Sequence, residues 1–344
     1  MEFHKVSGRA PRRCTGTLWI APVTQQSHQK DRYGIGRLKF SGVLIHAVAV
    51  LAAAKLVFAL QDVVIKEMSQ TYAVHQIMVI RSVSAFPVLL GLVLFTHKSL
   101  ALNSPRKLLL LLRGVLMAGA FLFFYLALSA MPLTTVTVLF FTAPFFIMVF
   151  SIPLLGERVE PSRWLAVIVG FVGVVIVVRP DTASFGIEST LPVIAAVLYA
   201  ACQVLARRVA TQESAAVMTF YANVAFLAFG IVLALALVVI KPDPAAGVSV
   251  QFLLRTWSMP DPIDLLFLVL TGVSMGIGFA LSTQAYRVME AHRLAPFEYI
   301  MLLWVVLLSY LAWSELPDVN TMVGSLIIIG SGLYVLNRSP SIID

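Results

Sequence analysis

The stretch that decides the fold runs from Ala127 to Arg179 and holds two apolar segments separated by one polar break. The first segment contains Thr142-Ala-Pro-Phe-Phe-Ile-Met-Val-Phe150 and ends at Leu155-Gly-Glu157. The second begins after Pro161 and is rich in valine and glycine. Each has roughly the 20 residues that a helix needs to cross a bilayer. The stretch therefore predicts two membrane-spanning helices joined by a short polar loop.

The same pattern returns 158 positions later, where Met131 falls on Met289 and Glu157 on Glu315. An earlier part of the chain repeats with a shift of 142 positions, which places Lys66 on Arg208, Gln70 on Gln212, Ala73 on Ala215 and Arg81 on Asn223. The identities are few, so the shared hydropathy and the polar break carry the comparison. Internal repeats in a membrane protein are typical of transporters.

Composition restricts the chain to one broad class. Of its 344 residues, 59% are hydrophobic and 12% are charged, and the mean hydropathy is +0.91. A soluble domain cannot bury this much apolar surface, and the strands of a membrane β-barrel would alternate apolar and polar residues, which this chain does not. We expect an all-α multi-span membrane protein.

Ten spans are expected, near residues 43–67, 72–96, 106–130, 132–152, 162–179, 187–208, 215–240, 263–287, 292–313 and 319–336. Eight of the 25 Lys and Arg residues lie in the first 39 positions, and most others lie in alternate short loops. This is the positive-inside pattern, so both termini are predicted to be cytoplasmic and the net charge of +8 does not indicate nucleic-acid binding.

The repeat divides the chain into parts. We expect a basic, disordered cytoplasmic tail over residues 1–40, a first repeat of five spans over 41–182, a second over 183–338, and a short tail over 339–344. A transit peptide would share the composition of the first part. Five spans is an odd number, so the two repeats are predicted to have opposite orientations, which places a substrate site near the bilayer midplane between them.

These features resemble the EamA family of the drug/metabolite transporter superfamily. The resemblance rests on the two sets of five spans, on Pro144 before Gly156-Glu157, on Phe58-Ala-Leu-Gln-Asp62, and on Pro296-Phe-Glu-Tyr299. It covers roughly residues 43–337, and Ser314-Glu315 departs from the usual Gly-Glu. The resemblance implies a metabolite permease of the bacterial inner membrane.

Four ionisable residues inside spans are candidates for substrate binding, because each costs about 2.5–3.5 kcal/mol at a helix centre and needs a partner. They are Lys55, Asp62, Arg81 and Glu298. Two cations against one carboxylate leave a positive charge that a substrate carboxylate or phosphate can neutralise, although an internal salt bridge is the competing interpretation. For Lys66 we expect a surface pair with Asp62, four residues earlier.

Three aromatic residues complete the candidate site as a substrate wall, namely Tyr125, Tyr221 and Trp304. For Glu298, a partner role toward Arg287 or Arg293 competes equally with substrate binding. The segment Gly272-Val-Ser274-Met-Gly276 matches both the nucleophile pattern of hydrolases and the G-x-x-x-G pattern of closely packed membrane helices, and we favour helix packing.

The function expected from these observations is secondary active transport of a small solute by alternating access. The solute is expected to be anionic or zwitterionic and amino-acid-like, with a larger cofactor-like molecule of the riboflavin or S-adenosylmethionine class as the alternative. An intramembrane serine hydrolase using Ser274 and a membrane receptor or scaffold are the alternatives from other classes. No cofactor, metal or nucleic-acid partner is expected, the lipid bilayer surrounds the protein, and the oligomeric state stays open between monomer and homodimer.

Overall fold

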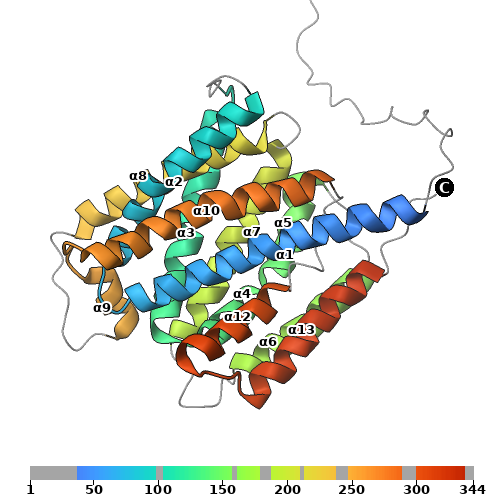
Figure 1. Ribbon diagram of the computed structural model, residues 1–344. Helices are drawn as coiled ribbons and strands as arrows, with labels where there is room; N and C mark the ends of the chain where they lie inside the picture. Colours follow the sequence, from blue (N-terminus) through green and yellow to red (C-terminus); the bar gives the residue numbers. More distant parts are fainter. Residues whose placement is uncertain are drawn as a thin grey trace, which may run out of the picture. The chain divides into compact units, whose positions relative to one another are not determined.

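The computed structural model describes residues 37–97, 104–156, 161–178, 187–209, 213–237, 247–288 and 300–337. Within these ranges the chain is helical and contains no strand (Figure 1). The part from Ser41 onward forms one compact unit. The expected tail over residues 1–40 lies almost wholly outside the described residues.

The helices follow the spans expected from the sequence, and one of the expected spans is split in two. Their bounds are α1 Arg37–Met68, α2 Val74–His97, α3 Lys107–Ala130, α4 Leu133–Phe140, α5 Ala143–Leu155, α6 Pro161–Val178, the 3-10 turn η1 Ile187–Thr190, α7 Leu191–Val209, α8 Ala215–Leu237, α9 Val248–Leu254, α10 Pro262–Val288, α12 Ile300–Trp313 and α13 Val319–Asn337.

Seven helical segments are long and apolar enough to cross a membrane. They cover residues 45–68, 74–95, 107–130, 133–155, 188–206, 216–237 and 262–282, and each coincides with an expected span. The other three expected spans coincide with shorter apolar helices over 168–177, 300–313 and 319–331. The ten-span count therefore stays a prediction for these three segments.

The expected fourth span is not one continuous helix but contains a break. Helix α4 ends at Phe140 and α5 begins at Ala143, with Pro144 in its first turn. Proline has no backbone N–H to donate to the preceding turn, so the hydrogen-bond ladder cannot run through this point. At the end of α4, the Leu139 carbonyl accepts from both the Thr142 hydroxyl, at 2.8 Å, and the Thr142 backbone N–H, at 3.2 Å.

Helix α2 lies against both α8 and α10, and α3 lies against α7 and α8. Small residues permit the closest of these contacts. A Cβ on Gly272 of α10 would overlap the carbonyl oxygen of Arg81, and one on Gly276 would lie 2.6 Å from the Val88 side chain. The close helix packing predicted from Gly272-x-x-x-Gly276 is confirmed, and it joins α10 to α2.

A second glycine contact joins α6 to α13, which run side by side (Figure 1). A Cβ on Gly173 would lie 2.8 Å from the carbonyl oxygen of Gly324. The exposed side chains that the structure describes on α6, such as Ile168 and Phe171, are apolar. An apolar outer surface is what a bilayer requires of a protein that crosses it.

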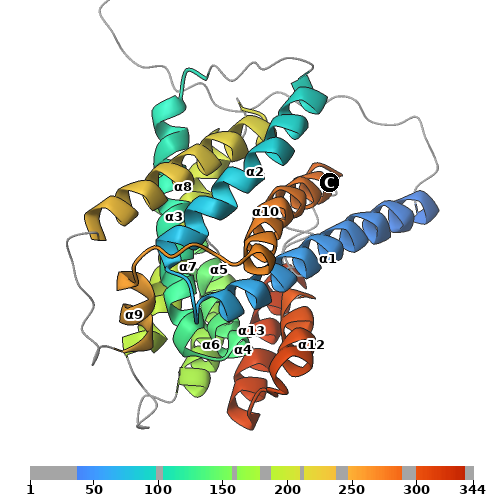
Figure 2. The same ribbon diagram turned by 60° about the vertical axis from the view of Figure 1, so that its left-hand side comes forward.

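Helix α1, drawn in blue in Figure 2, is held differently from the others. Among the described residues, no other helix runs close along its backbone. Large side chains make the contacts instead: the Phe58 ring lies against Phe279 of α10, with centroids 5.6 Å apart, and Trp304 of α12 reaches the Ala52 carbonyl. Side chains, rather than backbone contact, therefore set the position of α1.

Candidate substrate site

Arg81 is the centre of the candidate site, because it is the largest fully buried side chain in the described part of the protein, with 0% exposed. Its guanidinium donates a hydrogen bond to the Tyr125 hydroxyl of α3. Its Cζ also lies 4.6 Å from the ring centroid of Phe121 and 5.4 Å from that of Phe226. Aromatic rings attract a desolvated cation, so Arg81 sits in an aromatic enclosure made by α3 and α8.

Asp62 of α1 is the carboxylate of the same cluster. Its side chain is 4% exposed, accepts a hydrogen bond from Gln61, and interacts electrostatically with Arg81. Tyr125 is within electrostatic range of both charges. The structure thus brings together Asp62, Arg81 and Tyr125, which the sequence placed on three different spans.

Backbone contacts on both sides fix Arg81 in place. On one side, Gly272 of α10 lies against the Arg81 carbonyl. On the other side, the Asn223 amide of α8 donates to the carbonyl of the adjacent Ser82 at 3.0 Å. Asn223 is fully buried, and its Oδ1 has no partner among the described residues. In the internal repeat, Asn223 aligns with Arg81. The structure brings these two related positions close together where α2 packs on α8.

Trp304 connects α12 to α1. Its indole N–H donates to the Ala52 carbonyl at 3.1 Å, one turn before Lys55. The Lys55 ammonium lies 6.0 Å from the Phe58 ring centroid on the same helix, and the side chain is half-buried. Trp304 and Lys55 therefore lie beside α1 about two turns nearer its Arg37 end than Asp62.

Tyr221 belongs to a different cluster from Tyr125. It packs beside Leu110, Val217 and Met218, where the first turns of α3 and α8 meet, and its ring lies against Phe220. The structure does not join Tyr221 to the Arg81 cluster. Glu298, the last candidate, lies outside the described residues, as does Arg293, whereas Arg287 lies in the last turn of α10.

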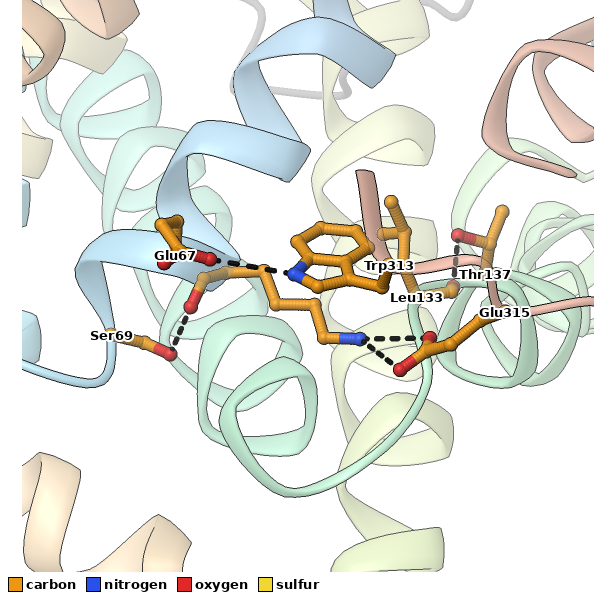
Figure 3. A network of polar contacts seen from close by, with 7 residues as sticks. Glu67, Ser69, Leu133, Thr137, Trp313 and Glu315 are labelled. Carbon is orange, nitrogen blue, oxygen red and sulfur yellow. Dashed lines mark hydrogen bonds and ion pairs between the residues drawn. The ribbon is translucent and has the colours of Figure 1, made fainter. Parts of the chain in front are cut away.

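The expectation for Lys66 is wrong about its partner. Its ammonium pairs with Glu315, at 3.1 Å and 3.3 Å from the two carboxylate oxygens, and lies 4.2 Å from the ring centroid of Trp313 (Figure 3). The expected pair with Asp62 rested on helix spacing alone. The Lys66 side chain instead reaches Glu315, which the tertiary fold brings within hydrogen-bond distance.

Phe121 and Phe226 were not among the residues proposed from the sequence. Phe121 precedes Tyr125 by one helical turn, so helix periodicity places both on one face of α3. Phe226 gave no such signal, because only the packing of α8 on α2 brings it to Arg81. Cation–aromatic contacts between distant segments depend on tertiary structure and leave no local pattern.

Ser274 lies inside the continuous helix α10, between the two glycines that pack on α2. A nucleophile elbow needs a strand before the serine and a helix after it. A serine nucleophile also needs a histidine base, and His75 of α2 packs beside the Trp257 ring, with centroids 6.2 Å apart. The local geometry around Ser274 is that of helix packing.

A polar cap covers the turn between α1 and α2. The Tyr72 hydroxyl donates to Asp264 at 2.6 Å, and the Gln76 amide donates to the Ser258 carbonyl at 2.6 Å. Arg255 donates to the Ser69 carbonyl at 2.9 Å, and desolvation lowers its pKa. The segment after α9 therefore holds the start of α2 in position.

Comparison with known proteins identifies the family. The EamA-like transporter family model matches residues 45–179 and again residues 188–337. The S-adenosylmethionine uptake transporter of Rickettsia prowazekii (strain Madrid E) is 27% identical over 249 residues, which are 72% of this chain and 78% of that protein. The pseudopaline exporter CntI of Pseudomonas aeruginosa (strain UCBPP-PA14) is 28% identical over 290 residues, 84% of this chain and 93% of that protein.

Two further matches agree with this assignment. The riboflavin transporter of Brucella anthropi is 28% identical over 221 residues, which are 64% of this chain and 73% of that protein. One solved crystal structure shares the fold with a TM-score of 0.57 at 18% identity, over 86% of this chain and 96% of that chain. The matched segments, together with the long apolar helices, show that this chain is a multi-pass membrane protein and belongs to the EamA-like transporter family.

Proposed function

We propose that the protein is a secondary active transporter that moves a small anionic or zwitterionic metabolite across the bacterial inner membrane by alternating access. The observation that carries the proposal is the buried cluster of Arg81, Asp62 and Tyr125 inside the membrane-crossing helices. An intramembrane guanidinium is costly and cannot lose its proton, so it requires a compensating role. Binding a substrate carboxylate or phosphate supplies that role.

The proposed site consists of Lys55, Asp62, Arg81, Tyr125, Trp304 and Glu298, with Tyr221 as a separate wall residue. Arg81 provides two parallel donors to an anionic group, a geometry that an ammonium cannot copy. Asp62 offsets part of its charge when no solute is bound. The two matches to the family model support the proposal of two inverted five-span repeats, which places this site between them.

A second candidate solute is a larger, cofactor-like molecule. The relatives named for S-adenosylmethionine and riboflavin support it, as does the aromatic lining of Phe121, Tyr125 and Phe226. Such rings can stack on a planar heterocycle once the guanidinium binds an anionic group. Uptake of radiolabelled amino acids, S-adenosylmethionine and riboflavin by proteoliposomes distinguishes the two solute classes.

Arg81→Ala tests the role of the site. We expect uptake to fall at least about a hundredfold, because a bound anion loses two charge-assisted hydrogen bonds. Arg81→Lys should keep the charge and still weaken apparent affinity. Arg208→Ala, at an exposed position on α7, is the matched control and should transport normally. Normal uptake by Arg81→Ala, or a loss explained by failure to accumulate, would contradict the binding role.

The proposed topology places both chain ends in the cytoplasm. A reporter fused after Arg338 should be active in its cytoplasmic form and silent in its periplasmic form. A fusion active only in the periplasm would contradict the predicted cytoplasmic C-terminus. Fusions after Met68 and after His97 should report opposite sides of the membrane, because α2 lies between them.

A further inference from the structure

We propose that Lys66, Trp313 and Glu315 form a latch that closes one mouth of the solute path by holding the Met68 end of α1 against the turn after α12. This proposal rests on the transport function proposed above and identifies how access to its site is controlled. None of the three residues belongs to the proposed substrate site.

The contacts of the latch join segments that are far apart in the chain. Lys66 and Glu315 are separated by 249 positions, and their side chains meet at 3.1 Å (Figure 3). The Trp313 ring covers the Lys66 ammonium at 4.2 Å, and its indole N–H donates to Glu67 at 3.4 Å. The last residue of α12 and the turn after it therefore contact two consecutive charged residues of α1.

The latch lies directly above the candidate site along α1. Lys66 follows Asp62 by four residues, so the two share one face of the helix at a separation of about 6 Å along its axis. Ile65 and Ala59 nearby on α1 are fully buried, whereas Leu60 is exposed on the outside of the bundle. Any solute that reaches Asp62 from the Met68 end must pass the plane of the latch.

The strength of the contacts suits a structure that opens and closes. The Lys66 side chain is 12% exposed and that of Glu315 is 39% exposed. Ion pairs that water can reach contribute little net stability, so they break and form again at small cost. The ring of Trp313 adds a cation–aromatic attraction and shields the pair on one side. Together these contacts can bias the position of a helix without fixing it.

Helix α1 is suited to be the moving part. Its described neighbours meet it through side chains such as Phe58 and Trp304 rather than along the backbone. Contact through side chains resists sliding and tilting less than interlocked backbones do. When the latch opens, α1 can move away from the turn after α12, while α2 stays fixed by α8 and α10.

The test measures access to the path directly. In a chain carrying Cys14→Ser and Cys202→Ala, which removes both native cysteines, Ala59→Cys places one thiol on the latch side of α1, about 10 Å below Lys66 along the helix. Vesicles of known orientation are treated with a membrane-impermeant methanethiosulfonate on the face that carries Met68. We expect slow labelling of Ala59→Cys while the latch is intact.

Opening the latch should raise the labelling rate about five- to tenfold, the change expected from losing a screened ion pair and a cation–aromatic contact. Glu315→Gln and Lys66→Met change the local charge in opposite directions, so an increase in both separates opening from simple attraction of the reagent. The exchanged pair Lys66→Glu with Glu315→Lys should restore slow labelling. Leu60→Cys, on the outside of α1, should label at one rate in every background.

Equal labelling of Ala59→Cys with and without the latch would overturn the proposal, as would an exchanged pair that labels as fast as the single variants. Solute uptake in the same vesicles separates this result from the proposed function. Uptake by the parent chain with latch-independent labelling rejects the latch alone. Latch-dependent labelling without uptake of any probe rejects the transport assignment and leaves the access control standing.

Discussion

Helices α1 and α2 follow each other in the chain and each carries one charge of the central cluster, yet they are held in different ways. Helix α2 is in backbone contact with its neighbours, through Gly272 on one side and Asn223 on the other. Helix α1 is held by buried side chains and by contacts such as those of Trp304, Lys66 and Phe58, without a neighbour running close along its backbone. Arg81 therefore lies on a helix that backbone contacts fix, and Asp62 lies on a helix that side chains position.

Because of this difference, we call α2 the fixed wall of the candidate site and α1 its movable wall. Arg81 lies on the fixed wall, where a guanidinium can keep one geometry through a transport cycle. Asp62 lies on the helix whose position depends on side-chain contacts. A cycle in which α1 moves relative to α2 would change the separation of the two charges, and with it the binding of an anion, without rearranging the rest of the cluster.

The largest effect is expected from disturbing the contact between α10 and the fixed wall, α2. Gly272→Ala forces a methyl group against the Arg81 carbonyl. The backbone of α2 cannot move aside as a side chain can, so we expect the free energy of unfolding to fall by about 1–3 kcal/mol. Thermal unfolding in detergent, followed by size-exclusion chromatography, measures it.

The matched control is Gly278→Ala, on the same helix but facing α1. The added methyl group meets the end of the Phe58 ring, 2.7 Å away, which can rotate aside. Alanine also favours the helix by about 0.5–1 kcal/mol over glycine. Equal destabilisation by the two substitutions would contradict the distinction between the walls.

A smaller effect is expected from loosening the movable wall. Trp304→Phe keeps an aromatic ring and removes the N–H that donates to the Ala52 carbonyl, so the unfolding free energy should fall by about 1 kcal/mol. Uptake should change more than stability does, because the link between α12 and α1 is lost. Trp164→Phe, on the exposed face of α6, should change neither quantity, and a similar result for both tryptophans would weigh against the link.

The smallest effect concerns the cap over the turn between the two helices. Tyr72→Phe removes the hydrogen bond to Asp264 and should cost about 1 kcal/mol or less. That hydrogen bond, together with burial, raises the pKa of Tyr72 above its ordinary value of 10.0. The hydrogen bond then stabilises the fold fully below pH 10.0 and is lost as the pH rises through the raised pKa.

The pH dependence provides the measurement for this substitution. The difference in melting temperature between the parent protein and Tyr72→Phe should be constant at neutral pH and shrink above pH 10.0. A difference that grows with pH in that range would mean that the fold favours the ionised Tyr72, which contradicts a hydrogen bond donated to Asp264.

The sequence by itself determined the features that depend on local composition. Apolar length predicted the helices, and the spacing of Gly272 and Gly276 predicted a close helix contact that the structure confirms. The insertion cost of a buried guanidinium identified Arg81 before any neighbour was known. Each of these follows from one segment and its solvent, the bilayer, so no information about the rest of the fold was needed.

Only the tertiary structure decided which side chains meet. It paired Lys66 with Glu315 rather than Asp62, placed Phe226 on Arg81, and separated Tyr221 from Tyr125. Helix periodicity gives the face on which a residue lies, but the partner of that face depends on how all the helices pack. Long side chains such as lysine and tryptophan reach across helices, so their partners follow from three-dimensional proximity and not from spacing along the chain.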